Sequence, residues 1–159
     1  MTSKVLCRLV RVAVIAVAIC GLAACIYALP TYGAGIAENN PDYAGRYIPW
    51  LVFLWMTAIP CFAFLVFIWM VSTAIKNDKL FTLQSARLFK IGAIVLFFDV
   101  GFFFIGNIVF VLLGMSNPGI LLLSIIADVF GASLAVMVAI LSRYLTKAAA
   151  LQEEADSTI

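Results

Sequence analysis

Long uncharged apolar segments constrain this chain more than any other feature of its sequence. Residues 12–29 contain no charged side chain over 18 residues, and residues 47–75 contain none over 29. Residues 91–142 are 52 residues long and contain only two charged side chains, Asp99 and Asp128. A helix crosses the hydrocarbon core of a membrane in about 20 residues, so this last segment is long enough for two helices. An Asn-Pro pair flanked by glycines within residues 114–119 predicts the turn between them.

The composition indicates that lipid is the solvent for most of this chain. It is 65% hydrophobic and 11% charged, whereas soluble domains are about a quarter charged. A closed β-barrel also satisfies the backbone in lipid, but the alternating pattern of such strands is absent. We therefore predict an all-α fold, a bundle of four transmembrane helices in a single membrane domain of residues 1–159. The helices are expected near residues 5–29, 47–75, 88–113 and 119–143.

The basic residues predict the orientation of these helices. Nine of the ten fall on one side of the arrangement, and only Arg46 lies in the first loop, residues 30–46. The nine are Lys4, Arg8 and Arg11 near the N-terminus, Lys76, Lys79, Arg87 and Lys90 around the middle loop, and Arg143 and Lys147 after the last helix. Because cytoplasmic segments are enriched in Lys and Arg, we expect both termini, including a tail of residues 144–159, in the cytoplasm.

Asp99 and Asp128 are the only ionisable side chains predicted deep in the bilayer, where such groups are rare and often functional. At 1.5 Å per residue, Asp99 lies about 16 Å from the inner end of its helix and Asp128 about 14 Å from the outer end of the next. Asn107 comes close to the height of Asp128, and Ser124 lies one turn from it. Arg11, the nearest cation, reaches at most toward Asp99, so we expect a protonated Asp128 that donates to Asn107 in a polar clamp between helices. Proton or cation coupling in a transporter is the alternative.

No residue pattern predicts an enzyme. Histidine is absent, which removes the commonest general base and metal ligand. The four cysteines form no Cys-x-x-Cys pair, and the sequence contains no phosphate-binding loop or serine elbow. We therefore expect no catalytic residue, no cofactor-binding residue and no metal site. The net charge of +2 is too small to indicate direct nucleic-acid binding.

Two helices carry small residues at a spacing of four, which lets a neighbouring backbone approach closely. They are Ala127, Gly131, Ala135 and Ala139 in the fourth helix, and Ala16, Cys20, Ala24 and Ala28 in the first. Each stripe predicts contact within the bundle or, alternatively, a surface for a homo-oligomer or a membrane partner.

The first helix also contains a second motif. Leu22-Ala23-Ala24-Cys25, after a basic start and an apolar segment, matches the cleavage box of a lipoprotein signal peptide. The apolar sequence continues through Leu29 where a lipoprotein usually has a polar tether. We therefore expect this segment to be a transmembrane helix.

The segments at the cytoplasmic side are candidates for binding a partner. Thr82 is placed to cap the third helix, and Phe81 to pack against its first turn. After the fourth helix, helical spacing of apolar residues continues through Leu151 and is followed by acidic Glu154 and Asp156. This predicts that the fourth helix extends beyond the membrane, either as a solvated helix end or as a docking surface.

The motifs of these two segments resemble those of the domain-of-unknown-function 2975 family, which consists of bacterial four-helix membrane proteins. The resemblance is carried by Phe81-Thr82 ahead of a basic helix start at Arg87, and by the tail Glu154-Ala155-Asp156-Ser157-Thr158-Ile159. Two residues depart from the family pattern, because a polar residue is expected in place of Ala155 and an aliphatic one in place of Ser157.

The resemblance implies a place in the bacterial inner membrane and assigns no activity. Similar proteins are frequently encoded beside a small helix-turn-helix transcription regulator. It therefore implies a regulatory or scaffolding protein that docks such a partner through Phe81, Thr82, Arg87, Glu154 and Asp156. A small transporter, or an accessory subunit of one, that uses Asp99 and Asp128 is the alternative.

Overall fold

The computed structural model describes residues 3–39, 41–76 and 82–157. Its elements are α1 (Ser3–Ala23), the π-helix η1 (Ala24–Ala28), α2 (Leu29–Asn39), α3 (Pro41–Lys76), α4 (Leu83–Leu112) and α5 (Pro118–Ser157). Because α1, η1 and α2 follow one another without a break, the described residues form four helices that are long and apolar enough to cross a membrane, and they contain no strand. The predicted all-α fold with four membrane-spanning helices is confirmed.

The helices are longer than the sequence analysis predicts. The first continues from residue 29 to Asn39, and α3 begins at Pro41, so most of the loop predicted for residues 30–46 is helical. Proline is favoured in the first turn of a helix, where its missing N–H has no partner to lose, and Asp42 in that turn is favourable for the helix dipole. α4 begins at Leu83 rather than near 88. α5 continues past residue 143 to Ser157, and this extension was predicted from the helical spacing through Leu151.

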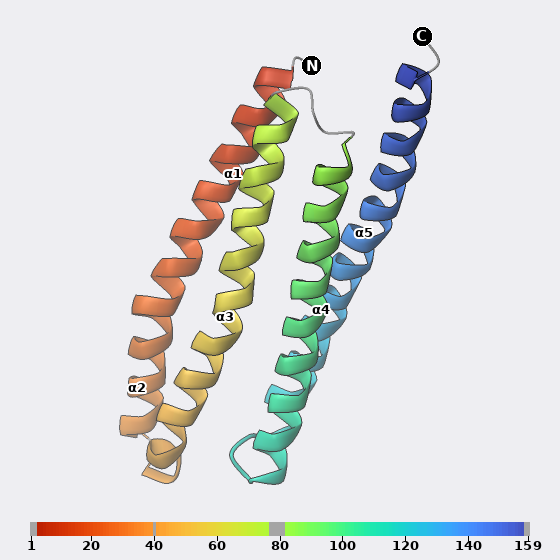
Figure 1. The fold of residues 1–159 in the computed structure, drawn as a ribbon. Coiled ribbons are helices and arrows are strands. Elements are labelled where there is room, and N and C mark those ends of the chain that lie inside the picture. The colour runs from red at the N-terminus through yellow and green to blue at the C-terminus, as the bar shows by residue number, and fades with distance from the viewer. Residues whose placement is uncertain (1–2, 40, 77–81, 158–159) are drawn as a thin grey trace.

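The helices pack in the order in which they occur along the chain. The continuous helix formed by α1, η1 and α2 packs on α3. α3 in turn packs on α4, and α4 packs on α5. Within the described ranges, the backbones of α1 and α2 do not closely approach those of α4 or α5, and α3 does not closely approach α5. α1 and α4 begin, and α3 and α5 end, at the same end of the molecule (Figure 1). The four helices therefore form an open row, in which α1 and α5 each have one neighbour.

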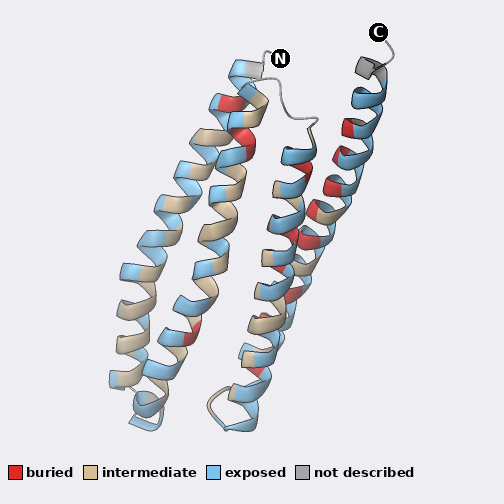
Figure 2. Cartoon of the chain, in the orientation of Figure 1, coloured by how far each residue is buried: buried red, intermediate tan, exposed pale blue. Residues whose placement is uncertain are grey.

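α4 and α5 make the most extensive helix–helix contact, and small residues allow their backbones to come close. Ala135 is 0% exposed and packs with Ala93, Leu96 and Val138. A Cβ atom built on Gly131 would lie 2.9 Å from the Cγ2 atom of Val100. The buried residues gather most densely where these two helices face each other (Figure 2). The small residues from Gly131 to Ala139 therefore serve contact within the bundle.

The small-residue stripe of the first helix is oriented differently. Ala16, Cys20 and Ala24 are exposed, and Ala28 is half-buried. Gly21 instead faces α3, where a Cβ atom would lie 3.2 Å from the Cζ atom of Phe62. The stripe therefore lies on a lipid-facing side of α1, and its use by a second copy stays a prediction.

Aromatic rings fill the half of the α3–α4 contact that is nearer the α4–α5 turn. Phe53 is buried, and its ring centroid lies 5.6 Å from that of Phe103 and 5.2 Å from that of Phe110. Trp50 stacks on Phe110 at 4.6 Å. Gly106 leaves the space that the Phe53 ring occupies, because a Cβ atom there would overlap it. α3 and α4 are thus held together by a large residue packed against a glycine.

The π-helix η1, which follows the last residue of α1, is explained by Pro30. In η1 the Leu29 N–H bonds to the Ala24 carbonyl, one residue further back than in an α-helix. The next donor in this pattern is residue 30, but proline has no N–H, so the Cys25 carbonyl lacks a partner within its helix. Trp55 of α3 supplies one, because its Nε1 donates to the Cys25 oxygen at 2.9 Å. The carbonyl that Pro30 leaves without a partner in its own helix therefore accepts a hydrogen bond from the neighbouring helix α3.

We predict that Trp55→Phe lowers the free energy of unfolding by about 1–3 kcal/mol, because it leaves the Cys25 carbonyl unsatisfied in lipid. Unfolding of the protein in bicelles, followed by circular dichroism, measures this.

Pro30→Ala is the matched background for this experiment, because alanine at this position restores an N–H that can bond to the Cys25 carbonyl. In the Pro30→Ala background, Trp55→Phe should lower the free energy of unfolding only by the packing that is lost when the indole is replaced by a smaller phenyl ring. An equal loss in both backgrounds would show that the Trp55 hydrogen bond contributes nothing.

Candidate functional site

The turn between α4 and α5 places the polar residues of the two helices at matching heights. Gly114 has a φ of 66°, a left-handed conformation that glycine adopts without strain. The Oδ1 atom of Asn117 accepts a hydrogen bond from the Ile120 N–H at 2.9 Å and so caps the start of α5. The predicted turn at residues 114–119 is confirmed, and the chain reverses there so that α5 runs back along α4.

Asn107 of α4 and Ser124 of α5 form a buried hydrogen bond between the two helices. The Ser124 hydroxyl lies 2.7 Å from the Oδ1 atom of Asn107, and Asn107 is 2% exposed. The Nδ2 group of Asn107 donates to the Phe103 carbonyl at 2.8 Å. The Ile120 carbonyl, at 2.8 Å, is a second acceptor for the Ser124 hydroxyl. The predicted polar clamp therefore exists, but Ser124 rather than Asp128 is the partner of Asn107.

The two intramembrane carboxyls are incompletely hydrogen-bonded. Asp99 accepts a hydrogen bond from the thiol of Cys61 in α3 at 3.3 Å through Oδ2, while its Oδ1 is buried without a partner among the described residues. Asp128 is 9% exposed, and its Oδ2 likewise has no partner in the described part of the chain. Buried polar atoms are normally paired, so these two carboxyl oxygens, like the Ser116 hydroxyl, are exceptions among the described residues.

Arg11 does not reach Asp99. The expectation that its side chain extends toward Asp99 is therefore wrong. Its Nε donates to the Ser72 hydroxyl at 3.0 Å, and its Nη2 to the Thr73 hydroxyl at 3.1 Å. Its guanidinium also lies 5.0 Å from the ring centroid of Trp69. The described residues bring no Lys or Arg side chain into a hydrogen bond with Asp99 or Asp128, and they contain no group of three or more His, Cys, Asp or Glu side chains that could hold a metal ion.

At the other end of α4, Thr82 caps the helix as predicted. Its Oγ1 accepts a hydrogen bond from the Ser85 N–H at 3.3 Å. The Ser142 hydroxyl donates to the Ala86 carbonyl at 3.0 Å, which ties α5 to the first turn of α4. Arg87, the next residue, is exposed. Thr82 therefore stabilises the start of α4, and Arg87 is the residue of this pair that is placed to meet a partner.

The last part of α5 continues past the start of α4. Leu145 and Ala149 are 5% exposed, whereas Tyr144 and Leu151 are both 66% exposed. Glu154 is also exposed, and it lies 12 residues after Ser142, or about 18 Å further along the helix. Arg87 and Glu154 are thus well separated along α5.

Two of the predicted docking residues are not covered by these observations. Phe81 lies outside the described residues. Asp156 is in the last turn of α5, but its side chain is outside the described part of the structure. Both stay predictions.

A comparison with protein families decides what this chain is related to. A family model described as "Protein of unknown function (DUF2975)" matches residues 31–159. The chain belongs to the DUF2975 family. No curated protein and no solved structure matches it. The match includes all of α3, α4 and α5, hence both the intramembrane polar residues and the docking candidates of this DUF2975 protein.

Sequence reasoning missed several contacts in this DUF2975 protein, among them the partners of Arg11 and Trp50. Ser72 and Thr73 hold Arg11, and the Nε1 of Trp50 donates to the Met115 carbonyl at 3.0 Å, which ties α3 to the α4–α5 turn. The adjacent Ser-Thr pair, four residues before Lys76, is a signal that could have indicated the Arg11 site. The Trp50 contact has no such signal, because its acceptor is a backbone carbonyl.

We predict that Ser124→Ala lowers the free energy of unfolding by about 1–2 kcal/mol, because the Oδ1 atom of buried Asn107 then loses its donor. Unfolding in bicelles by increasing fractions of sodium dodecyl sulfate measures this.

Ser133→Ala is the matched control on the same helix, because the exposed Ser133 hydroxyl bonds only to the Val129 carbonyl of its own helix at 2.7 Å. If the two variants unfold alike, the Asn107–Ser124 bond does not hold α4 and α5 together.

Proposed function

We propose that this DUF2975 protein is a multi-pass protein of the bacterial inner membrane that acts by binding rather than catalysis. Its role is to dock a cytoplasmic partner at the end where α1 and α4 begin. The positions of the basic residues support this orientation, because cytoplasmic ends of membrane helices are enriched in Lys and Arg. The described basic residues at this end are Lys4, Arg8, Arg11, Lys76, Arg87, Lys90, Arg143 and Lys147, and the described one at the other end is Arg46.

The observation that carries the proposal is the length and surface of α5. The helix has 40 residues, or about 60 Å, whereas the hydrocarbon core is about 30 Å thick. After Ser142, Leu145 and Ala149 are buried along one side of α5. Tyr144, Ala148 and Leu151 lie at a spacing of i, i+4 and i+7, which places them along one stripe of the helix. We call these three residues the docking face.

The docking face has the chemistry of a helix that binds in a partner's groove. Apolar anchors at this spacing are the usual contacts in such complexes, and Tyr144 and Leu151 are strongly exposed. Glu153 and Glu154 lie two and three residues after Leu151 and are exposed. DNA-binding regulators carry basic surfaces, so an acidic segment beside apolar anchors favours such a partner. A small helix-turn-helix transcription regulator, which the family resemblance also suggests, is the partner that we propose.

We expect the protein, purified from its native host in mild detergent, to retain a small DNA-binding protein in a stoichiometric ratio that mass spectrometry detects. Leu151→Ala should release this protein because it removes an apolar anchor. Substitution of Phe81, Arg87 or Asp156 should weaken its retention without reducing insertion into the membrane.

Leu123→Ala is the matched control, because Leu123 is 69% exposed on the same helix but lies near its other end. It should leave the partner bound. Recovery of the protein alone, or equal retention by the Leu151→Ala and Leu123→Ala variants, would contradict the docking face.

Ion-coupled transport is a second candidate function, favoured by the two carboxyl oxygens that are buried without a partner among the described residues. Ionisable residues at this depth commonly mark ion pathways. Asp99 is half-buried beside Cys61, which is exposed on α3. In an open row of helices, Asp99 is therefore near a surface that a second protein can cover.

Under this alternative, Asp99→Asn and Asp128→Asn should each abolish proton flux into liposomes that contain the protein while the helix content is retained. A pH-sensitive dye inside the liposomes measures the flux, and Glu154→Gln serves as a carboxyl control outside the bilayer. If the unmodified protein gives no flux above that of empty liposomes, transport is excluded. Unfolding of both variants would assign the two carboxyls to helix packing.

A further inference from the structure

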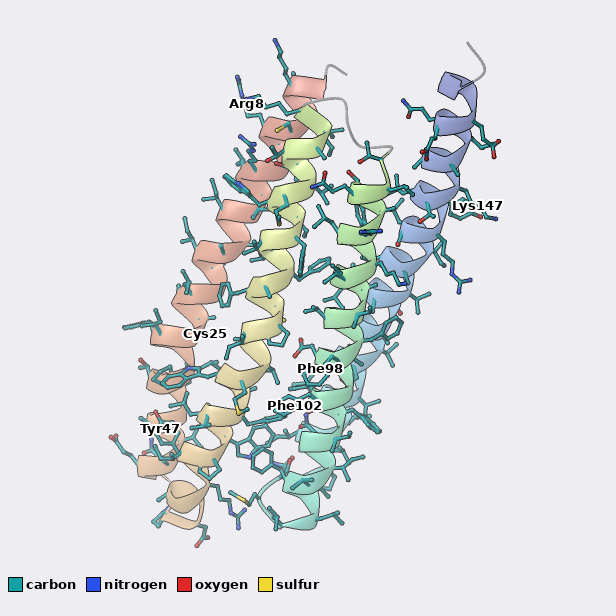
Figure 3. The ribbon with its side chains drawn as sticks, viewed as in Figure 1. Arg8, Cys25, Tyr47, Phe98, Phe102 and Lys147 are labelled. Carbon is teal, nitrogen blue, oxygen red and sulfur yellow. The ribbon has the colours of Figure 1, made fainter. Side chains whose placement is uncertain are left out.

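A cavity of about 360 Å³ lies between the first turns of α1 and the last turns of α3. Four of its lining residues are basic: Lys4, Arg8 and Arg11 from α1, and Lys76 from α3. None of the described lining residues is acidic. Arg8 lies at the end of α1 that carries the chain's N-terminus (Figure 3). Four cations from two helices therefore converge on one cavity at the boundary of the membrane.

Arg11 is held in position at the deepest part of this cluster. Ser72 and Thr73 accept hydrogen bonds from its Nε and Nη2 atoms, and Trp69 lies against the face of its guanidinium. The Nη1 group makes no hydrogen bond with the described residues, so its two N–H donors remain for a ligand. A fixed guanidinium with donors to spare is suited to bind the oxygens of a phosphate.

The basic side chains that line the cavity repel one another, and a bound anion would offset this repulsion. Lys4 and Arg8 are four residues apart on α1, and Arg8 and Arg11 three apart, so like charges lie next to each other on one side of the helix. Within the part of the chain that the structure describes, Lys4, Arg8 and Lys76 have no ion-pair partner. Orientation in the membrane requires only that these charges lie on one side; it does not require them to share a cavity.

The other side of the same cavity is apolar. Val12 and Ile15 continue α1 into the hydrocarbon region, and both are lining residues together with Trp69. A ligand here meets cations at one end and lipid-facing apolar side chains at the other. A free inorganic anion would leave the apolar end unused, whereas a lipid uses both.

We propose that this cavity binds the phosphate of an anionic glycerophospholipid, with its headgroup among Lys4, Arg8, Arg11 and Lys76 and an acyl chain along Val12 and Ile15. Basic pockets between helices at the cytoplasmic face bind anionic headgroups in other membrane proteins. The site is separate from the docking face and from Asp99 and Asp128, so it stands whether or not the proposed function holds.

The test is native mass spectrometry of the full chain, delipidated in dodecyl maltoside and titrated with dioleoyl phosphatidylglycerol. The unmodified protein should bind this lipid, and dioleoyl phosphatidylcholine should bind far more weakly. Arg8→Gln removes a charged partner of the phosphate and should weaken binding about tenfold. Arg87→Gln is the matched control, because it removes one exposed arginine from the same end of the molecule but not from the cavity, and it should leave the affinity unchanged.

Three results would overturn the proposal. Equal weakening by Arg8→Gln and Arg87→Gln would mean that only the total charge matters. Equal binding of phosphatidylcholine would mean that the acyl chains alone are recognised. Displacement of phosphatidylglycerol by inorganic phosphate at an equal concentration would assign the cavity to a free anion. Circular dichroism of each variant shows whether the helices are retained.

Discussion

The absence of water from the hydrocarbon core is the constraint on which this structure depends. A polar group there must find its partner inside the protein, and here several partners come from a neighbouring helix. Trp55 donates to the carbonyl that Pro30 leaves free, and Ser124 donates to Asn107. Ser142 donates to a carbonyl of α4 near the membrane boundary. Each bond satisfies a group and at the same time sets how two helices lie against each other. Because most of the surface is apolar, these few bonds and the fit of small residues carry the specificity of the packing.

The number of helices could be predicted from the sequence, because uncharged length is a sufficient signal in a membrane protein. The helical ends could not. Residues 30–46 contain Pro30 and several polar residues, which indicate a loop in a soluble protein. Here Pro30 is accommodated by a π-turn whose free carbonyl Trp55 satisfies, so the helix continues to Asn39. The residue that allows the helix to continue past Pro30 is Trp55 on α3, so the sequence around Pro30 alone does not reveal it.

The polar clamp shows a second limit. Heights along the two helices predicted Asp128 as the partner of Asn107, whereas the structure pairs Asn107 with Ser124, four residues before Asp128 on α5. The choice between them depends on a difference of one helical turn, which residue counting cannot resolve when turns and boundaries are uncertain. The path of Arg11 depends likewise on the rotation of α1 about its axis, which turns it toward Ser72 and Thr73. Heights follow from the sequence, while rotations follow from packing such as that of Phe53 against Gly106.

The row of helices, in which each packs on the one before it, also bears on how the protein is assembled. A helix that leaves the ribosome last needs to find only its immediate predecessor, because in the described residues the backbone of α5 closely approaches that of α4 and not those of α1 or α3. Each new contact then closes only one short connection, which keeps the entropy cost of each step small. Assembly can therefore follow the order of synthesis, with no early helix waiting for a distant later one. In a closed bundle, the side of α1 that faces away from α3 would have had to wait for α5 before it was covered.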